Sequence, residues 1–135
     1  MNSQEKKRYL QQYCKLDKVI IQKLEEYKRL ESLCTNATSA ISGMPNGGTW
    51  STEDWYVKLA DLSKEIDREI DRYVDLRKEI EEAIDGVEDK TLQTILRCRY
   101  ISGMSWERIA ALLNYDCRWV LRLHGRALGE VELSG

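Results

Sequence analysis

Three arginines near the end of the chain have the spacing and the chemistry of a nucleic-acid contact. Arg118, Arg122 and Arg126 follow one another at steps of four, so a helix brings them onto one face. A guanidinium group binds phosphate oxygens and the edge of guanine, so this stripe predicts a DNA-binding helix. The opposite face is apolar and consists of Val120, Leu123, Ala127 and Val131. A packed helix that is merely kept soluble by its arginines would explain the same pattern.

The predicted DNA contacts are Arg118, Arg122, Arg126, Cys117 and Leu121. Positive residues outnumber negative ones throughout residues 90–128, where the acidic residues are Glu107 and Asp116. The acidic excess therefore lies in the preceding helices and at the extreme end of the chain. A net charge of -2 for the whole chain does not argue against a nucleic-acid partner.

No comparable pattern predicts catalysis, a metal site or a cofactor. The echo EIDREIDR at residues 65–72 interleaves carboxylates with arginines at helical spacing, which is typical of a solvated surface. The four cysteines, Cys14, Cys34, Cys98 and Cys117, form no C-x-x-C pair, and His124 is the only histidine. We expect His124 to be a surface or packing residue. The sequence therefore predicts a non-enzymatic protein with no catalytic residue, no metal and no cofactor.

Composition predicts an all-α protein. The chain has 135 residues, of which 33% are charged, with no Phe and one Pro, and helix-forming Leu, Ile, Glu, Lys and Arg dominate. No apolar segment at the N-terminus resembles a signal peptide, and no apolar run could span a bilayer. We expect a cytoplasmic protein with reduced thiols and no membrane partner.

Apolar periodicity divides the chain into two predicted domains. Steps of three and four from about residue 3 to Cys34, and again from Trp55 to Ile84, predict two long helices that fold back as an antiparallel hairpin over residues 1–87. Small polar residues and glycines predict a flexible loop at 35–53. Residues 88–135 form the second predicted domain, giving about five helices in all.

Some apolar residues of the predicted hairpin lie off its seam. They would stay exposed to water in a monomeric hairpin, and they are Ile21, Leu33, Val57 and Val74. A homodimer would cover them. Docking of the C-terminal third against the hairpin would also cover them.

Capping residues divide the last third into short helices. Asp89, Ser105 and Asp116 are good N-terminal caps, while Gly103 and Asn114 suit helix ends. Ser105 begins the helix WERIAALL, whose predicted buried residues are Ile109, Ala110, Leu112 and Leu113. The short connection before Asp116 predicts a helix-turn-helix. We expect Trp119 to pack on the preceding helices as a hydrophobic anchor.

The stretch LRCRYISGMSWERIAALLNYDCRWVLRLHGRAL resembles region four of bacterial sigma factors, in which a Ser-aromatic-Glu-x-Ile-Ala helix precedes a recognition helix ending in x-Arg-Ala. The whole chain resembles a domain-of-unknown-function family of small proteins from phages and prophages of Gram-positive bacteria. Sigma factors usually carry a small or polar residue at the position of Trp119 and a basic or polar one at that of Leu121.

This resemblance implies a transcription regulator that binds double-stranded DNA through its last helix and contacts RNA polymerase. The chain has no counterpart of the region with which sigma factors melt promoters, so a complete sigma factor is excluded. The alternative is a phage assembly or packaging adaptor in which the helices mediate oligomerisation.

Overall fold

The computed structural model describes residues 1–39 and 51–133 of the chain. Every regular element in these ranges is helical, which confirms the expected all-α fold. The elements are α1 (Ser3–Ser39), α2 (Thr52–Asp85), α3 (Lys90–Leu96), the π-helical turn η1 (Arg97–Ile101), α4 (Trp106–Leu113) and α5 (Cys117–Glu130). None of the described helices is both long enough and apolar enough to cross a membrane. No disulfide bond involves any of the four cysteines, all of which lie among the described residues.

The predicted loop at residues 35–53 is wrong at both ends. Helix α1 continues to Ser39, and α2 begins at Thr52. The Thr35 hydroxyl donates a hydrogen bond of 3.0 Å to the Glu31 carbonyl one turn earlier, so this polar side chain is satisfied inside the helix. Residues 35–39 also contain no Gly or Pro that would end a helix. The rest of the predicted loop, residues 40–50, lies outside the described residues.

The chain forms two compact units, one of residues 17–72 and one of residues 1–16 with 73–135. This division differs from the predicted domains, 1–87 and 88–135. The reason lies in the core of the second unit, where apolar residues from the start of α1 and the end of α2 join those of the C-terminal helices. Its buried members include Leu10, Tyr13, Leu76, Ile80, Ile84, Leu92, Ile95, Ile109, Val120 and Val131.

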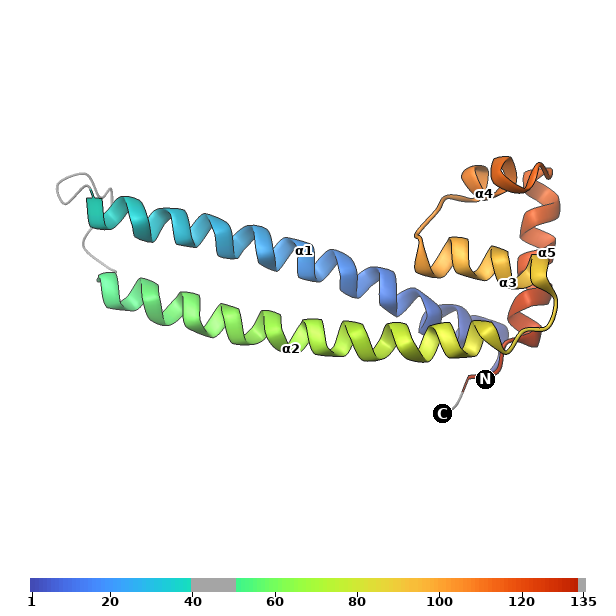
Figure 1. Ribbon diagram of the computed structural model, residues 1–135, viewed down its shortest axis with the longest axis horizontal. Helices are drawn as coiled ribbons and strands as arrows, with labels where there is room; N and C mark the ends of the chain where they lie inside the picture. The colour runs from blue at the N-terminus through green and yellow to red at the C-terminus, as the bar shows by residue number, and fades with distance from the viewer. Residues whose placement is uncertain (40–50, 134–135) are drawn as a thin grey trace. The chain divides into compact units, whose positions relative to one another are not determined.

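The unit of residues 17–72 is a pair of antiparallel helical segments from α1 and α2 (Figure 1). Their shared seam buries Leu30, Cys34, Leu59, Leu62 and Ile66. Beside this seam the Lys23 ammonium donates to Glu65 and Glu69, at 2.9 and 3.3 Å. The hydrogen bond to Glu65 raises the pKa of Lys23 and lowers that of Glu65. These two ion pairs favour the observed register but stabilise the fold little, because all three side chains remain partly exposed to water.

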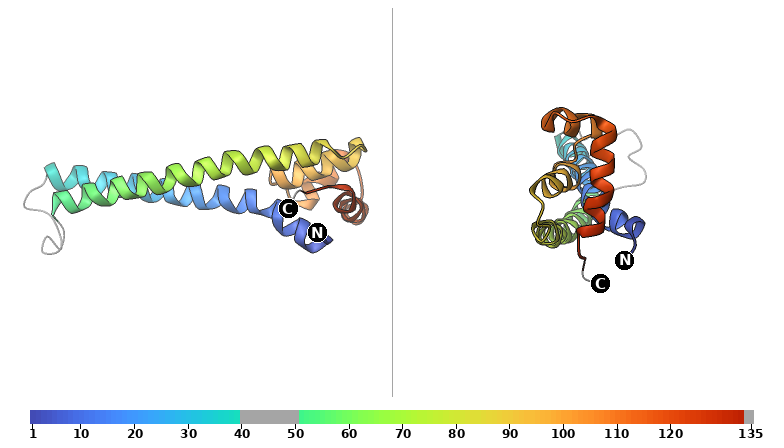
Figure 2. Two further views of the ribbon diagram at one scale, coloured as in Figure 1. Left: turned by 90° about the horizontal axis from the view of Figure 1, so that it is seen from below. Right: turned by 90° about the vertical axis from the view of Figure 1, so that its right-hand side faces the viewer.

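The other unit places the C-terminal helices around one core (Figure 2). Helix α5 packs on both α3 and α4. The start of α1 also reaches α5, because the Lys6 ammonium donates a hydrogen bond of 3.0 Å to the Leu128 carbonyl. Tyr13 on α1 stacks on Tyr73 of α2 with ring centroids 4.5 Å apart. The ends of the two long helices therefore form part of the scaffold that holds α5.

The predicted apolar face of α5 is confirmed, because Val120, Leu123, Ala127 and Val131 are all buried. The prediction for the preceding helix is only partly right. Ile109 and Ala110 are buried and Leu113 is half-buried, whereas Leu112 is 62% exposed. Helix α4 has only eight residues and a narrow packed face, so the stripe of Ile109 and Leu113 leaves Leu112 on the solvent side.

The apolar residues that lie off the predicted hairpin seam are all exposed in the structure. Their exposed fractions are 48% for Ile21, 42% for Leu33, 59% for Val57 and 58% for Val74. Val74 belongs to the same unit as the C-terminal helices, and those helices leave it uncovered. Docking of the C-terminal third therefore does not account for Val74.

Candidate nucleic-acid interface

The connection between α4 and α5 is short and locally well defined. Ser105 begins α4 by accepting a hydrogen bond of 3.2 Å from the Arg108 amide, and Asp116 begins α5 by accepting one of 3.3 Å from the Arg118 amide. Between the helices, Asn114 adopts the left-handed conformation with φ of 58°. The Tyr115 amide then donates to the Ala110 carbonyl at 2.9 Å. These features confirm the predicted caps and the predicted end of α4.

Helix α5 has one buried face and one basic face. Val120 and Ala127 are fully buried, whereas the side chains of Arg118, Arg122 and Arg126 are exposed. At about 100° per residue the three arginines span an arc of about 80° on the side away from the core. The structure therefore brings the three predicted arginines onto one accessible surface.

Two other predicted contact residues occupy different surroundings. Leu121 is 46% exposed and lies beside the arginines on the accessible half of α5. Cys117 is half-buried and packs against the core. Cys117 is near the arginine face only because it lies in the first turn of α5, and its side chain is on the packed side of that helix.

Trp119 does not have the role that was predicted for it. It is 41% exposed and is not among the residues packed against the core, so it is not a buried anchor. The neighbouring positions Val120 and Leu123 already fill the packed arc of α5. Trp119 lies outside that arc, at the edge of the arginine face.

The three arginines of α5 differ from two other arginines of the same unit. Arg97 pairs with the Asp85 carboxylate, and Arg99 lies over the Trp106 ring at 4.3 Å from its centroid. Within residues 1–39 and 51–133, no ion pair or side-chain hydrogen bond involves the guanidinium groups of Arg118, Arg122 and Arg126. Their donors are therefore free to bind a partner.

A buried polar pair, His124 and Tyr100, lies on the core side of α5, and it was not predicted from the sequence. His124 is 6% exposed, and its Nε2 lies 2.6 Å from the Tyr100 hydroxyl oxygen. The Trp106 ring meets the imidazole edge-on, at 4.6 Å between centroids. His124 is thus a packing residue, one of the two expected roles. A histidine at an apolar-face position of α5 was the available signal, but no local pattern identified Tyr100 as its partner.

Burial shifts the titration of both members of this pair. It lowers the pKa of His124 from 6.5 to about 4, with further lowering from the positive charges of Lys7 and Arg99. Burial also raises the pKa of Tyr100 to about 12. At neutral pH the imidazole is therefore uncharged and the phenol keeps its proton. The pair adds no charge beneath the arginine face.

Negative charge gathers at the other end of α5. A hollow of about 390 Å³ is lined by Tyr9, Glu79, Glu82, Ala83, Glu132 and Leu133. The Tyr9 hydroxyl donates a hydrogen bond to the Glu79 carboxylate. Nowhere in the described residues do three His, Cys, Asp or Glu side chains come together in a group that could hold a metal ion. Charge therefore changes sign along α5, from arginines in its first ten residues to carboxylates beyond its end.

Comparison with known proteins identifies the family of the chain. A family model described as "Protein of unknown function (DUF1492)" matches residues 33–130, so the chain belongs to this family. This confirms the expected membership of a domain-of-unknown-function family. The match includes all of α2, α3, α4 and α5. No curated protein and no solved structure gives a significant match.

Proposed function

We propose that this member of the DUF1492 family is a DNA-binding transcription regulator in which α4 and α5 act as a helix-turn-helix. The observation that carries the proposal is the stripe of Arg118, Arg122 and Arg126, which is exposed and unpaired among the described residues. In this arrangement α5 lies in the major groove, with its first turn toward the base edges. The resemblance to sigma region four, and to proteins of phages and prophages of Gram-positive bacteria, supports the same function.

The charge distribution along α5 supports one orientation on DNA. The arginines occupy the first ten residues of the helix, while Glu130 and Glu132 follow at its end. Phosphates attract the first group and repel the second, so the N-terminal part of α5 approaches the duplex. The N-terminal end of the helix dipole adds to this attraction.

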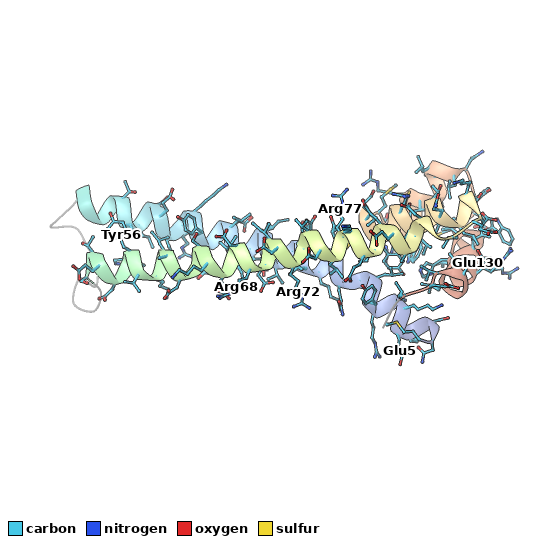
Figure 3. All side chains as sticks on the ribbon, turned by 60° about the horizontal axis from the view of Figure 1, so that its bottom comes forward. Glu5, Tyr56, Arg68, Arg72, Arg77 and Glu130 are labelled. Atoms are coloured by element: carbon cyan, nitrogen blue, oxygen red, sulfur yellow. The ribbon has the colours of Figure 1, made fainter. Side chains whose placement is uncertain are left out.

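Single arginine variants test the proposal, with fluorescence anisotropy on duplex pools at several salt concentrations. Arg122 lies in mid-helix, so Arg122→Ala should weaken binding to all sequences and reduce the salt slope by about one. Arg118 lies in the first turn, so Arg118→Ala should cost about 1 to 3 kcal/mol and relax the preference at one base pair. Arg68→Ala is the matched control, because Arg68 projects from the exposed face of α2 (Figure 3).

A second function is favoured by the apolar surface around the connection. Leu112, Tyr115 and Trp119 are 62%, 40% and 41% exposed, and side chains of this kind suit a protein partner. In this alternative the protein is a phage assembly or packaging adaptor. Absence of wild-type DNA binding below about 100 μM at low salt would favour the adaptor, because ordinary non-specific binding is tighter than that.

The proposed regulator has two further protein partners, RNA polymerase and a second copy of the chain. The resemblance to sigma region four supports the first, which co-sedimentation with purified bacterial polymerase would detect. The exposed side chains of Ile21 and Val57 support the second, because a homodimer would remove them from water. Sedimentation velocity should then give a dimer at micromolar concentration, and a monomer there would contradict self-association.

A further inference from the structure

We propose that α5 recognises thymine, through contacts of Leu121 and Trp119 with the C5-methyl groups that thymine presents in the major groove. The inference rests on the proposed DNA-binding function and adds to it the class of base that is read. The arginines then hold phosphates and guanine, while the two apolar side chains select thymine.

The placement of the two side chains on α5 is the first observation. At about 100° per residue, Leu121 lies about 60° to one side of Arg118, and Trp119 lies about 100° to the other side. Arg122 and Arg126 fall between Arg118 and Trp119. The two apolar side chains therefore flank the arginine stripe about 160° apart, so a duplex held by the arginines lies next to each of them on a different side of the helix.

Their exposure is the second observation. Leu121 is 46% exposed and Trp119 is 41% exposed, although buried positions on the same helix are filled by Val, Leu and Ala. Neither side chain belongs to the core or packs against it. Large apolar groups of this kind are removed from water when a partner covers them, which favours binding. On the base edges of the major groove, the apolar group that a side chain meets is the thymine methyl.

Helix α5 itself supplies none of the other common base-reading side chains before its last residue. Cys117–Glu130 contains no Asn, Gln, Ser, Thr or Lys, and its one acidic residue is Glu130 at the far end. Adenine is usually read by Asn or Gln, and cytosine by Glu or Asp near the base edges. The exposed half of α5 carries only arginines, apolar side chains and glycines before that glutamate. Guanine and thymine are the bases that such a surface reads directly.

Two glycines on the same face allow the duplex to come close to the helix. Gly125 and Gly129 fall within about 20° of Arg118, and a Cβ built at either position would have no atom within 4 Å. Packing inside the unit therefore does not require glycine at these positions. Each costs the helix about 1 kcal/mol relative to alanine. Because glycine has no side chain at these positions, the DNA can approach the helix backbone closely between the arginines.

The test compares thymine with uracil, which pairs identically but lacks the methyl group. The probe is a duplex enriched from a random pool by the wild-type protein and then synthesised again with deoxyuridine in place of thymidine. We expect affinity to fall about fourfold for each contacted methyl group. Leu121→Ala and Trp119→Ala should each abolish the uracil penalty at their own position. Leu112→Ala is the matched control, because Leu112 is an exposed leucine on α4, and it should keep the full penalty.

The outcomes separate this inference from the function on which it rests. Equal wild-type affinity for both duplexes, with binding that still weakens in Arg122→Ala, would overturn thymine reading and leave DNA binding in place. A uracil penalty of the same size in Leu121→Ala, Trp119→Ala and wild type would also overturn it, because the penalty would then reflect DNA shape. Failure to bind either duplex would overturn both proposals.

Discussion

Lowering the pH should destabilise the fold through His124, which lies beneath the proposed DNA-binding face. The folded protein lowers the pKa of this imidazole from 6.5 to about 4, first by burial and then through the charges of Lys7 and Arg99. Between pH 4 and pH 6.5 the His124 imidazole is therefore protonated in the unfolded chain but mostly neutral in the folded protein. The contribution of neutral His124 is complete above pH 6.5 and is lost as the pH falls toward 4.

The pKa values set the size of this loss. Each pH unit in that window costs about 1.4 kcal/mol, which gives at most about 3 kcal/mol by pH 4. Relaxation of the surrounding dipoles around a charged ring reduces this to about 2 kcal/mol. The Tyr100 hydroxyl contributes no slope of its own here, because its pKa of about 12 keeps it protonated throughout.

Urea unfolding followed by circular dichroism at pH 7 and pH 4 measures the effect in wild type and in His124→Gln. The variant has no titrating group at this position, while all the carboxylates remain and cancel in the comparison. We expect the free-energy difference between the two proteins to shrink by about 2 kcal/mol from pH 7 to pH 4. If the free-energy difference between wild type and His124→Gln is the same at both pH values, the buried imidazole does not stay neutral as proposed.

Two further predictions concern stability around the same helices. Trp119→Ala should cost less than about 1 kcal/mol of stability, because the side chain is 41% exposed. Ile109→Ala removes a fully buried side chain and should cost about 2 to 5 kcal/mol. Equal losses for the two variants in thermal unfolding would contradict the assignment of Trp119 to the surface and of Ile109 to the core. Asn114→Ala should destabilise by about 1 kcal/mol because φ there is 58°, and Asn114→Gly should be tolerated. If Asn114→Ala left the stability unchanged, the left-handed conformation at this position would not be required.

Features that depend on neighbouring residues could be predicted from the sequence. The Ser105 and Asp116 caps and the end of α4 at Asn114 each depend on a few adjacent positions. The arginine face of α5 followed from helical periodicity alone. These features define most of the candidate interface, and each of them depends on local sequence alone.

Features that depend on distant contacts could not be predicted in this way. Lys6 meets the Leu128 carbonyl across 122 positions, and Cys14 meets the Tyr100 carbonyl across 86. Contacts of this kind join the ends of the long helices to the C-terminal helices, so the predicted boundary at residue 87 does not match the compact units. The exposure of Trp119 depends in the same way on how completely its neighbours fill the core.

The most direct test of the central claim compares two arrays of positive side chains on the same protein. One variant replaces Arg118, Arg122 and Arg126 with Gln. Its control replaces Lys64, Arg68 and Arg72 with Gln, because these exposed residues of α2 have the same spacing and the same total charge but lie among carboxylates.

The salt dependence of binding to a duplex pool, measured by fluorescence anisotropy, distinguishes the two variants. We predict that the α5 variant binds more weakly and that its slope of log affinity against log salt flattens by about 1.8, at about 0.9 for each of the two phosphates that Arg122 and Arg126 no longer neutralise. The control should retain the wild-type affinity and slope. Equal behaviour of the two variants would contradict the proposal that the arginine face of α5 binds DNA.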